Sequence, residues 1–279
     1  AAHGGALGSG HDTVHLSADS GCFMLFAANV QQAVDFTFIA RRVSEETLVP
    51  GVVVMDGEQT ALAAQDVRLL SPNQAAHFLG SERDQIDSPT AAQKMLFGDS
   101  RRRLPAWHDL DEPVLSGAQF EPDSFALGAF GRRPFFDAFV DDSLSDAFDL
   151  IAAKTGRRHA PVSSYRMDGA TTALVAIGAA VETARAAADQ LRSEHKLRVG
   201  VLGIHSLRPF PGELLAASLG KPSQVLILER ADAPLSGEPP LTREIRAALP
   251  SAATRCSPVV YGIGGLPLRV SDLVALCKS

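Results

Sequence analysis

The sequence is poor in cysteine and contains no long hydrophobic run. Its three cysteines, Cys22, Cys256 and Cys277, are odd in number and have no CxxC spacing. This pattern argues against a disulfide framework and against an iron–sulfur cluster held by this chain alone. The longest uncharged stretches have the length of strands and are broken by glycine, so no transmembrane helix is expected. We therefore expect an intracellular protein of a reducing compartment, either the cytoplasm or an organelle matrix.

Basic residues are also few and scattered. The formal net charge is −6 at pH 7, and no cluster of four or more Lys and Arg occurs. This composition argues against nucleic-acid partners and against direct membrane insertion. The one basic run, Arg101–Arg103, is interpreted as a solvated turn. His3, His11 and His15 have no cysteine or carboxylate at ligand spacing apart from Asp12, and are interpreted as loop residues rather than metal ligands.

The residues that are abundant suit buried cores, since 46% of the chain is hydrophobic. Thr171–Ala180 is an uncharged apolar run, as expected for a strand buried on both faces of a parallel sheet. Val181–Glu194 then shows apolar residues at helical spacing, and Leu197–Ile204 is again short and apolar. The order strand, helix, strand predicts a right-handed βαβ crossover.

Other segments continue this alternation. In the C-terminal part we predict helices at Gly212–Leu219, Leu241–Leu249 and Val270–Lys278, and strands at Gln224–Leu228 and Pro258–Tyr261. In the N-terminal part we predict a strand at Thr13–Ser17, a helix capped by Asn29 that runs to about Glu46, and a strand at Gly51–Met55. Gly262, Gly264 and Gly265 are interpreted as a glycine-rich turn, because Pro267 interrupts the place of a phosphate-binding helix.

The alternation fails between Leu70 and Pro161, where proline and glycine recur at short intervals. We predict a mostly irregular connector with one helix at Ser143–Gly156, capped by Ser143. Its aromatic residues are expected to pack it onto its neighbours: Trp107, Phe120, Phe125, Phe130, Phe135 and Phe136. The predicted fold class is α/β, with domains of mainly parallel sheets flanked by helices at 1–70 and 166–279 and the connector at 71–165.

Several segments together resemble the pyruvate:ferredoxin oxidoreductase family. They read SGCFMLFAANVQQAVDF at Ser20–Phe36, VPGVVVMDGEQT at Val49–Thr60, ALVAIGAAVET at Ala173–Thr183, VLGIHSLRPFP at Val201–Pro211 and LERADAPLSGEP at Leu228–Pro239. The resemblance implies that 1–70 is the later part of a pyrimidine-binding domain of thiamine diphosphate enzymes. It also implies that 166–279 is a transketolase C-terminal-like domain. Enzymes of this family oxidatively decarboxylate 2-oxoacids, pass the acyl group to coenzyme A and send electrons to iron–sulfur clusters.

The resemblance is weakest where the family keeps its catalytic residues. Ala18 stands where the family has an arginine for the substrate carboxylate, and Asp19 beside it adds a like charge. Asp56 and Gly57 are kept in the second motif, but Gln59 replaces an arginine. The resemblance thus implies a degenerate pocket loop made of Ala18, Asp19, Ser20, Asp56, Gly57 and Gln59, with no catalytic residue and no metal ligand. By pattern alone, Asp56-Gly57 is a tight turn or, less favoured, a ligand loop at the end of a strand.

Two functions stay open. The favoured one is a non-catalytic 2-oxoacid:ferredoxin-oxidoreductase-like module, a structural or assembly part of a larger oxidoreductase complex. The alternative is a subunit or fragment of an active thiamine diphosphate-dependent pyruvate or 2-oxoacid:ferredoxin oxidoreductase. Thiamine diphosphate, Mg²⁺ and iron–sulfur clusters would then lie on partner chains, since none is expected to bind this chain alone. A third reading is an independent enzyme using His205, but a strand-end histidine bonded to backbone explains that residue better.

Partners are predicted from the first sheet. An apolar edge without a neighbouring strand is an association site. We therefore expect protein subunits or a second copy to bind the N-terminal domain around Thr13–Leu25 and Gly51–Leu70. Arg166–Ser279 is expected to fold as a more self-contained unit.

Overall fold

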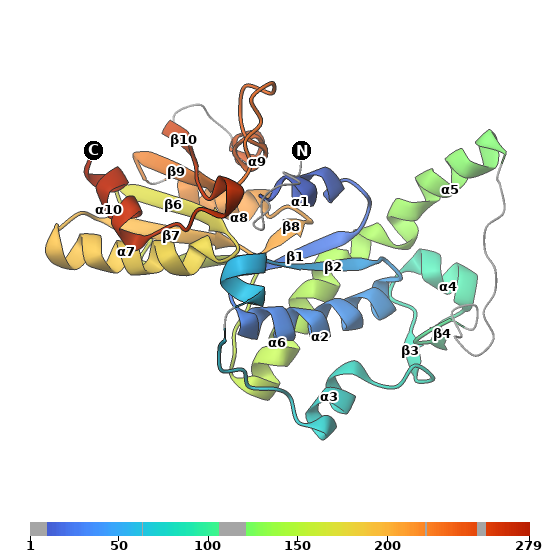
Figure 1. The fold of residues 1–279 in the computed structure, drawn as a ribbon. Helices are drawn as coiled ribbons and strands as arrows, with labels where there is room; N and C mark the ends of the chain where they lie inside the picture. The colour runs from blue at the N-terminus through green and yellow to red at the C-terminus, as the bar shows by residue number, and fades with distance from the viewer. Residues whose placement is uncertain (1–9, 63, 106–120, 221, 250–254) are drawn as a thin grey trace. The chain divides into compact units, whose positions relative to one another are not determined.

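The computed structural model describes residues 10–62, 64–105, 121–220, 222–249 and 255–279 (Figure 1). The chain forms two compact units, and each is built from separate stretches of sequence. Unit 1 comprises Ala1–Phe36, Val52–Arg68 and Ala160–Ser279, and unit 2 comprises Thr37–Gly51 and Leu69–His159. The bounds of these units differ from the three consecutive segments predicted from the sequence, 1–70, 71–165 and 166–279. The assignment of those segments to family domains stays a prediction.

The main sheet of unit 1 has five strands in the order β10-β9-β6-β7-β5. The strands are β5 (Val162–Tyr165), β6 (Thr172–Ile177), β7 (Val199–Ile204), β9 (Gln224–Glu229) and β10 (Arg255–Val260). All neighbours are parallel except β5, which runs antiparallel to β7 at the edge. Helix α7 (Ala180–Glu194) connects the parallel strands β6 and β7, so the predicted order of strand, helix and strand and the α/β fold class are confirmed.

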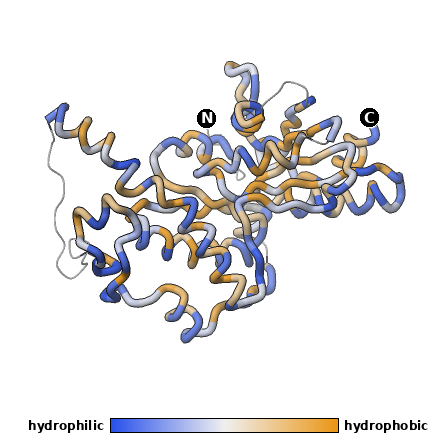
Figure 2. The backbone as a smooth tube through the Cα atoms, turned by 180° about the vertical axis from the view of Figure 1, so that it is seen from behind, coloured by the Kyte–Doolittle hydropathy of each residue, from blue (hydrophilic) through white to orange (hydrophobic). Residues whose placement is uncertain are grey.

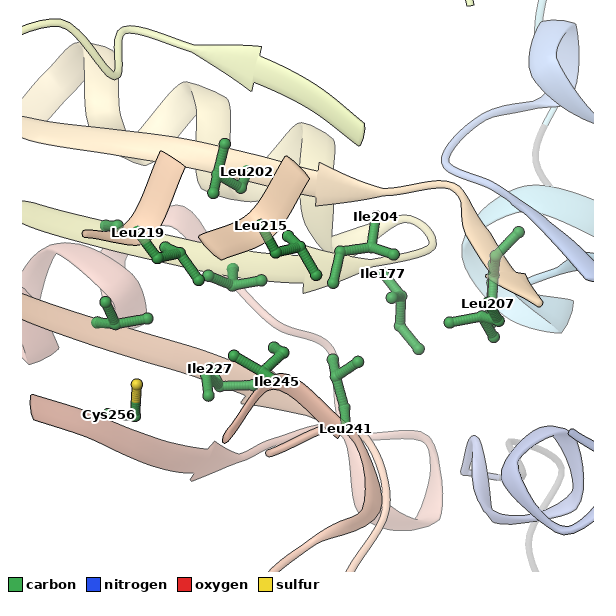
Figure 3. Packing of buried hydrophobic residues seen from close by; sticks show 14 of the residues in the cluster. Ile177, Leu202, Ile204, Leu207, Leu215, Leu219, Ile227, Leu241, Ile245 and Cys256 are labelled. Atoms are coloured by element: carbon green, nitrogen blue, oxygen red, sulfur yellow. The ribbon is translucent and has the colours of Figure 1, made fainter. Parts of the chain in front are cut away.

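Helices cover both faces of this sheet because alternate residues of a strand point to opposite faces. Leu174 and Ala176 of β6 pack in the cluster that includes α7 and α10 (Val270–Lys278). Val175 and Ile177 pack in the other cluster, with α8 (Gly212–Leu219) and α9 (Pro240–Ala248). Figure 3 shows the side chains of this second cluster converging from the strands and from both helices.

A second sheet of unit 1 has the order β2-β1-β8, from β1 (Phe23–Ala27), β2 (Gly51–Met55) and β8 (Ser206–Arg208). The prediction of a strand at Thr13–Ser17 is wrong, because α1 (Asp12–Ser17) is a helix. Val14 packs against the core while Leu16 is 80% exposed, so these residues lie on different faces, as a strand would not allow. Helix α2 (Val30–Thr47) begins after Asn29 as predicted, and the Asn29 Oδ1 atom accepts from the Gln32 amide at 2.9 Å.

Unit 2 is far more regular than the predicted connector. It contains α3 (Pro72–Leu79), β3 (Gln85–Asp87), α4 (Ala91–Phe97), β4 (Ser100–Arg102), α5 (Pro122–Phe135), a 3₁₀ turn (Asp137–Phe139) and α6 (Val140–Thr155). The reason is that several of its prolines and glycines lie at the ends of helices. Pro72 and Pro122 stand in the first turns of α3 and α5, and Gly80 and Gly98 follow the last residues of α3 and α4. Proline at the start and glycine at the end delimit helices instead of breaking them.

Two further details of unit 2 correct the sequence analysis. Helix α6 begins at Val140, so Ser143 is not its cap; the Ser143 hydroxyl donates to the Glu46 carboxylate at 2.8 Å. Gly156 does end the helix in the left-handed region, at φ 74°. The Arg101–Arg103 run is not a solvated turn, since Arg101 is 4% exposed and donates to the Glu45 and Glu46 carbonyls at the end of α2. A helix leaves its last carbonyls without intrahelical partners, and this guanidinium satisfies two of them.

The aromatic residues of unit 2 follow the packing prediction only in part. Phe135 and Phe136 are half-buried with ring centroids 6.1 Å apart. Phe125 and Phe130 are 68% and 80% exposed, so for them the prediction is wrong. Trp107 and Phe120 lie outside the described residues. Among the helices that the structure describes, none has the length and apolar character needed to cross a bilayer.

Candidate functional site

Asp56 is a buried carboxylate at the end of β2, and three donors from distant parts of unit 1 surround it. Its Oδ1 atom accepts from His11 Nε2 and from an Arg230 guanidinium nitrogen, both at 2.8 Å. Its Oδ2 atom accepts from the Ala179 amide at 2.7 Å. His11, Asp56 and Arg230 are each no more than 4% exposed. We call these three side chains and the Ala179 amide the Asp56 clasp.

The backbone around the clasp is shaped to admit the carboxylate. Ala179 precedes α7, whose first amides lack intrahelical partners and favour a negative charge. Gly178 has φ +64°, and a Cβ atom placed there would lie 2.2 Å from Asp56 Oδ2. After Asp56 the chain enters a short π-helical turn, Gly57–Ala61. The turn from β6 into α7 therefore has to be glycine for the carboxylate to reach the Ala179 amide.

The electrostatics of the clasp favour an ionised Asp56. Burial by itself raises the pKa of a carboxyl group, because it penalises the charged form. At Asp56 the hydrogen bond and charge of His11, the Ala179 amide and the Arg230 charge outweigh burial, and the pKa is lowered. Asp56 is thus a charged group that accepts three hydrogen bonds from protein donors.

Arg230 and His11 are fixed by further contacts. Arg230 follows β9 and also donates to the Gln59 side-chain oxygen at 3.2 Å and to the Gly262 carbonyl at 3.4 Å. The His11 amide donates to the Arg230 carbonyl at 2.8 Å. The clasp thereby joins the start of α1, the end of β2, the start of α7 and the end of β9.

A cavity of about 570 Å³ adjoins the clasp. It is lined mainly by polar side chains, including Asn29, Gln59, Asp66, Glu182, Arg230 and Tyr261. Burial, followed by the charge of Asp56, raises the pKa of Tyr261, so its phenol stays protonated. Among the charged lining residues, three carboxylates (Asp56, Asp66 and Glu182) face one guanidinium. The cavity therefore suits a neutral or cationic polar molecule better than an anion.

Thiamine diphosphate and its Mg²⁺ do not fit these residues. A diphosphate binds to cations, to a metal ion or to the free amides of a helix N-terminus. In the cavity carboxylates outnumber cations, and the Ala179 amide before α7 already donates to Asp56. Within the described ranges, no group of three His, Cys, Asp or Glu is placed to hold a metal ion. The side chains that line this cavity therefore offer poor binding to a diphosphate.

The structure brings only part of the predicted pocket loop together. Asp56 and Gln59 line the cavity and meet at Arg230, and Gly57 begins the adjoining turn. Ala18 instead packs in the hydrophobic core at 4% exposure, and the Ser20 amide only closes a turn onto Ser17. Asp19 lies on a different surface, where it pairs with Arg208 at 3.0 Å. That the loop is a degenerate pocket stays a prediction.

The histidines differ in how well the sequence predicted them. His205 is 1% exposed, with Nδ1 3.2 Å from the Phe26 carbonyl and Nε2 2.9 Å from Ser163 Oγ, as its structural interpretation predicts. His11 lies in the bend before α1, as the loop interpretation predicts, but it is buried and belongs to the clasp. His15 lies in α1, so for it the loop interpretation is wrong. His3 lies outside the described residues.

Sequence reasoning missed His11, Ala179 and Arg230 as partners of Asp56. Their separations from Asp56 along the chain are 45, 123 and 174 residues, so no local pattern connects them. The available signal was that Asp56, Ala179 and Arg230 each fall inside a segment of family resemblance, next to a strand end.

Two protein-family models match this chain. Residues 1–124 match the model of the thiamine diphosphate-binding domain of pyruvate flavodoxin/ferredoxin oxidoreductases. Residues 170–273 match the model of pyruvate:ferredoxin oxidoreductase core domain II. The first match extends beyond residue 70, and the assignment of 1–70 and 166–279 to a pyrimidine-binding and a transketolase C-terminal-like domain stays a prediction.

Related sequences support the same family, and a solved structure shares the fold. A probable pyruvate-flavodoxin oxidoreductase of Escherichia coli is 28% identical over 253 residues, which are 90% of this chain and 20% of that protein. The pyruvate synthase subunit PorA of Thermotoga maritima is 28% identical over 93% of this chain and 62% of its own length. A 2-oxoglutarate:ferredoxin oxidoreductase from Magnetococcus marinus shares the fold, with a TM-score of 0.53 at 15% identity, over 93% of this chain and 42% of that one.

The chain thus spans about a fifth of the length of the E. coli relative and less than two thirds of PorA. Two models from this family match the chain in consecutive stretches, and relatives match nine tenths of the chain. The chain belongs to the pyruvate:ferredoxin oxidoreductase family.

Proposed function

We propose that this chain is a non-catalytic 2-oxoacid:ferredoxin-oxidoreductase-like module that serves as a structural or assembly part of a larger oxidoreductase complex. One observation carries the proposal. The acidic residue kept from the family motif, Asp56, is 4% exposed and bonded to His11, Arg230 and Ala179. Three protein donors take up most of the hydrogen-bonding capacity of this carboxylate, which therefore serves mainly to stabilise the module.

The other pocket-loop residues support this proposal. Ala18 and Gln59 stand where the family has arginines, so neither supplies a bidentate partner for a 2-oxoacid carboxylate. Ala18 is also buried in the core, so an arginine there would place a charge among apolar side chains. The fold is kept while the site chemistry has changed, which is common within fold families.

Calorimetry of the purified chain with thiamine diphosphate and Mg²⁺ tests the proposal. We expect no heat of binding at micromolar concentrations, since the cavity beside Asp56 has excess negative charge. A thiamine diphosphate enzyme titrated in the same buffer serves as the positive control. Micromolar binding to this chain alone would overturn the proposal.

The similarity to PorA favours a second function, a subunit or fragment of an active oxidoreductase. In that case thiamine diphosphate, Mg²⁺ and iron–sulfur clusters lie on partner chains. Purification of the native complex, followed by assay of 2-oxoacid-dependent electron transfer, separates the two functions. Activity that is lost when Gln59 is replaced by Ala, while the complex stays assembled, would favour the catalytic function.

We also propose that partner chains bind around Thr13–Leu25 and Gly51–Leu70, in a reducing compartment. In the structure β8 covers one side of β1, and β2 forms the edge of the sheet. Exposed apolar side chains at the end of β2 and just after the turn that follows it, Met55 at 49% and Leu62 at 82%, support association there. Leu62→Asp is expected to reduce the amount of copurifying protein, while Leu235→Asp, at a residue of unit 1 that is 101% exposed, is expected to leave it unchanged.

A further inference from the structure

Helix α5 presents hydrophobic side chains to solvent along most of its length. Phe125, Leu127 and Phe130 are 68%, 73% and 80% exposed, and residues 121–130 are all exposed. Within unit 2, the start of this helix extends away from the other helices (Figure 1). In Figure 2 hydrophobic and hydrophilic residues alternate along it. Helix α5 thus has no described neighbour over the first part of its length.

The helix is too weak to be stable by its local propensity. It has 14 residues, with Gly128 and Gly131 in its interior and Pro134 near its end. Isolated helices of about this length are marginal in water even when rich in alanine, and each glycine costs about 1 kcal/mol relative to alanine. Packing by another molecule would supply the stabilisation that the sequence does not.

One face of α5 has the heptad spacing of a helix that pairs with another helix. Asp123, Ala126, Phe130 and Arg133 follow one another at intervals of three, four and three residues, so they share a face. All four are exposed. Neither Asp123 nor Arg133 forms an ion pair with a described residue, whereas the adjacent Arg132 pairs with Asp137 at 3.0 Å.

This face is complementary to itself under a two-fold axis. If two copies of α5 pack antiparallel about residue 128, Asp123 of each copy lies opposite Arg133 of the other. Phe130 of each copy then lies opposite Ala126 of the other. The charges attract, and the small alanine leaves room for the aromatic ring. A two-fold contact requires this kind of reciprocal match, because the same patch serves both partners.

We infer that α5 is a dimerisation helix whose partner is α5 of a second copy of this chain. The contact comprises Asp123, Ala126, Phe130 and Arg133, with Leu127 at its margin. A single helix pair buries less than the about 800 Å² per partner of a standard interface, so the expected affinity is micromolar. This surface is separate from the proposed partner edge at Gly51–Leu70, and either proposal can fail without the other.

Sedimentation of the whole 279-residue chain across the micromolar range tests the inference. We expect a monomer–dimer equilibrium for the unchanged chain. Phe130→Asp is expected to weaken the dimer by at least about tenfold. It removes the ring from each copy and places a carboxylate against Ala126 of the other copy. Phe125→Asp is the matched control, since Phe125 is also largely exposed but lies about 140° around the helix axis from Phe130, outside the proposed contact. The control is expected to dimerise as the unchanged chain does.

Charge exchange gives a sharper test that does not depend on one hydrophobic contact. Asp123→Arg alone and Arg133→Asp alone each place like charges opposite one another and are expected to weaken the dimer. The double variant restores opposite charges and is expected to restore the affinity. Circular dichroism confirms that each variant keeps its fold.

Three outcomes would overturn the inference. The first is an unchanged chain that stays monomeric throughout the micromolar range. The second is a dimer on which Phe130→Asp and Phe125→Asp act equally. The third is a double charge variant no better than the single variants. Loss of a different copurifying chain on Phe130→Asp, with no self-association, would assign α5 to another partner and would also overturn it.

Discussion

Asp56 and Arg230 stabilise each other only as a pair. Asp56→Asn leaves the Arg230 charge buried without its carboxylate, and removal of one partner of a buried pair costs about 3 to 5 kcal/mol of unfolding free energy. Urea denaturation at pH 7 measures this loss. Asp66→Asn is the control, because Asp66 is exposed at the cavity rim and its change should cost less than about 0.5 kcal/mol.

The difference between Asp56→Asn and the unchanged chain should depend on pH. The pKa of Asp56 is lowered in the folded state, so its ionisation stabilises the fold above the unfolded pKa of about 4. This contribution is lost as the pH falls through the folded value. The two proteins should therefore become more alike in stability below about pH 4. A difference that does not change with pH would contradict the charged clasp.

Only some residues of the Asp56 site could be predicted from the sequence. Asp56 and Gln59 could be singled out because a strand pattern precedes them and a family motif contains them. His11 could not, since a histidine next to Asp12 in a glycine-rich stretch looks like a loop residue. Its burial comes from folding the start of α1 against Arg230 and Asp56, which the sequence around His11 does not encode.

A side chain added at Gly178, in the turn between β6 and α7, should lower the stability of the fold. Gly178→Ala would place a Cβ atom 2.2 Å from Asp56 Oδ2 and 2.7 Å from the Phe26 ring, at a positive φ. Gly169→Ala has a similar φ of +66° but no atom within 4 Å of the added Cβ atom. Backbone strain alone costs about 1 kcal/mol, so thermal unfolding should show a clearly larger loss for Gly178→Ala. Equal losses would show that the carboxylate can move aside.

The elements that the sequence predicted well are those buried on both faces or amphipathic. β6, β7 and α7 lie within a few residues of their predicted bounds, and α8 and α10 match theirs. β5 and β8 were missed because VSSY and SLR are short and partly polar. Their extended conformation depends on pairing with β7 and β1. In unit 2 the frequent proline and glycine residues predicted irregular structure, although several of them lie at the ends of helices.

The core of unit 1 predicts how a shortened chain should behave. Arg166–Ser279 was expected to be more self-contained, but its core also includes Ala18, Met24 and Phe26 from the N-terminal stretch. That fragment also lacks β5, so the edge of β7 would be exposed. We expect the isolated fragment to aggregate or to unfold without cooperativity in urea. A monomer with a sharp unfolding transition would contradict this expectation.

The path of the chain between the two units has a mechanical consequence. The chain leaves one unit for the other after Phe36, Gly51, Arg68 and His159, and its first and last stretches both belong to unit 1. Tension applied to the two ends therefore acts first on unit 1. Unit 2 carries no load until β1 has been pulled from β8, because the link to unit 2 lies beyond that pairing. In a pulling experiment the first rupture should report on unit 1, and unit 2 should extend only afterwards.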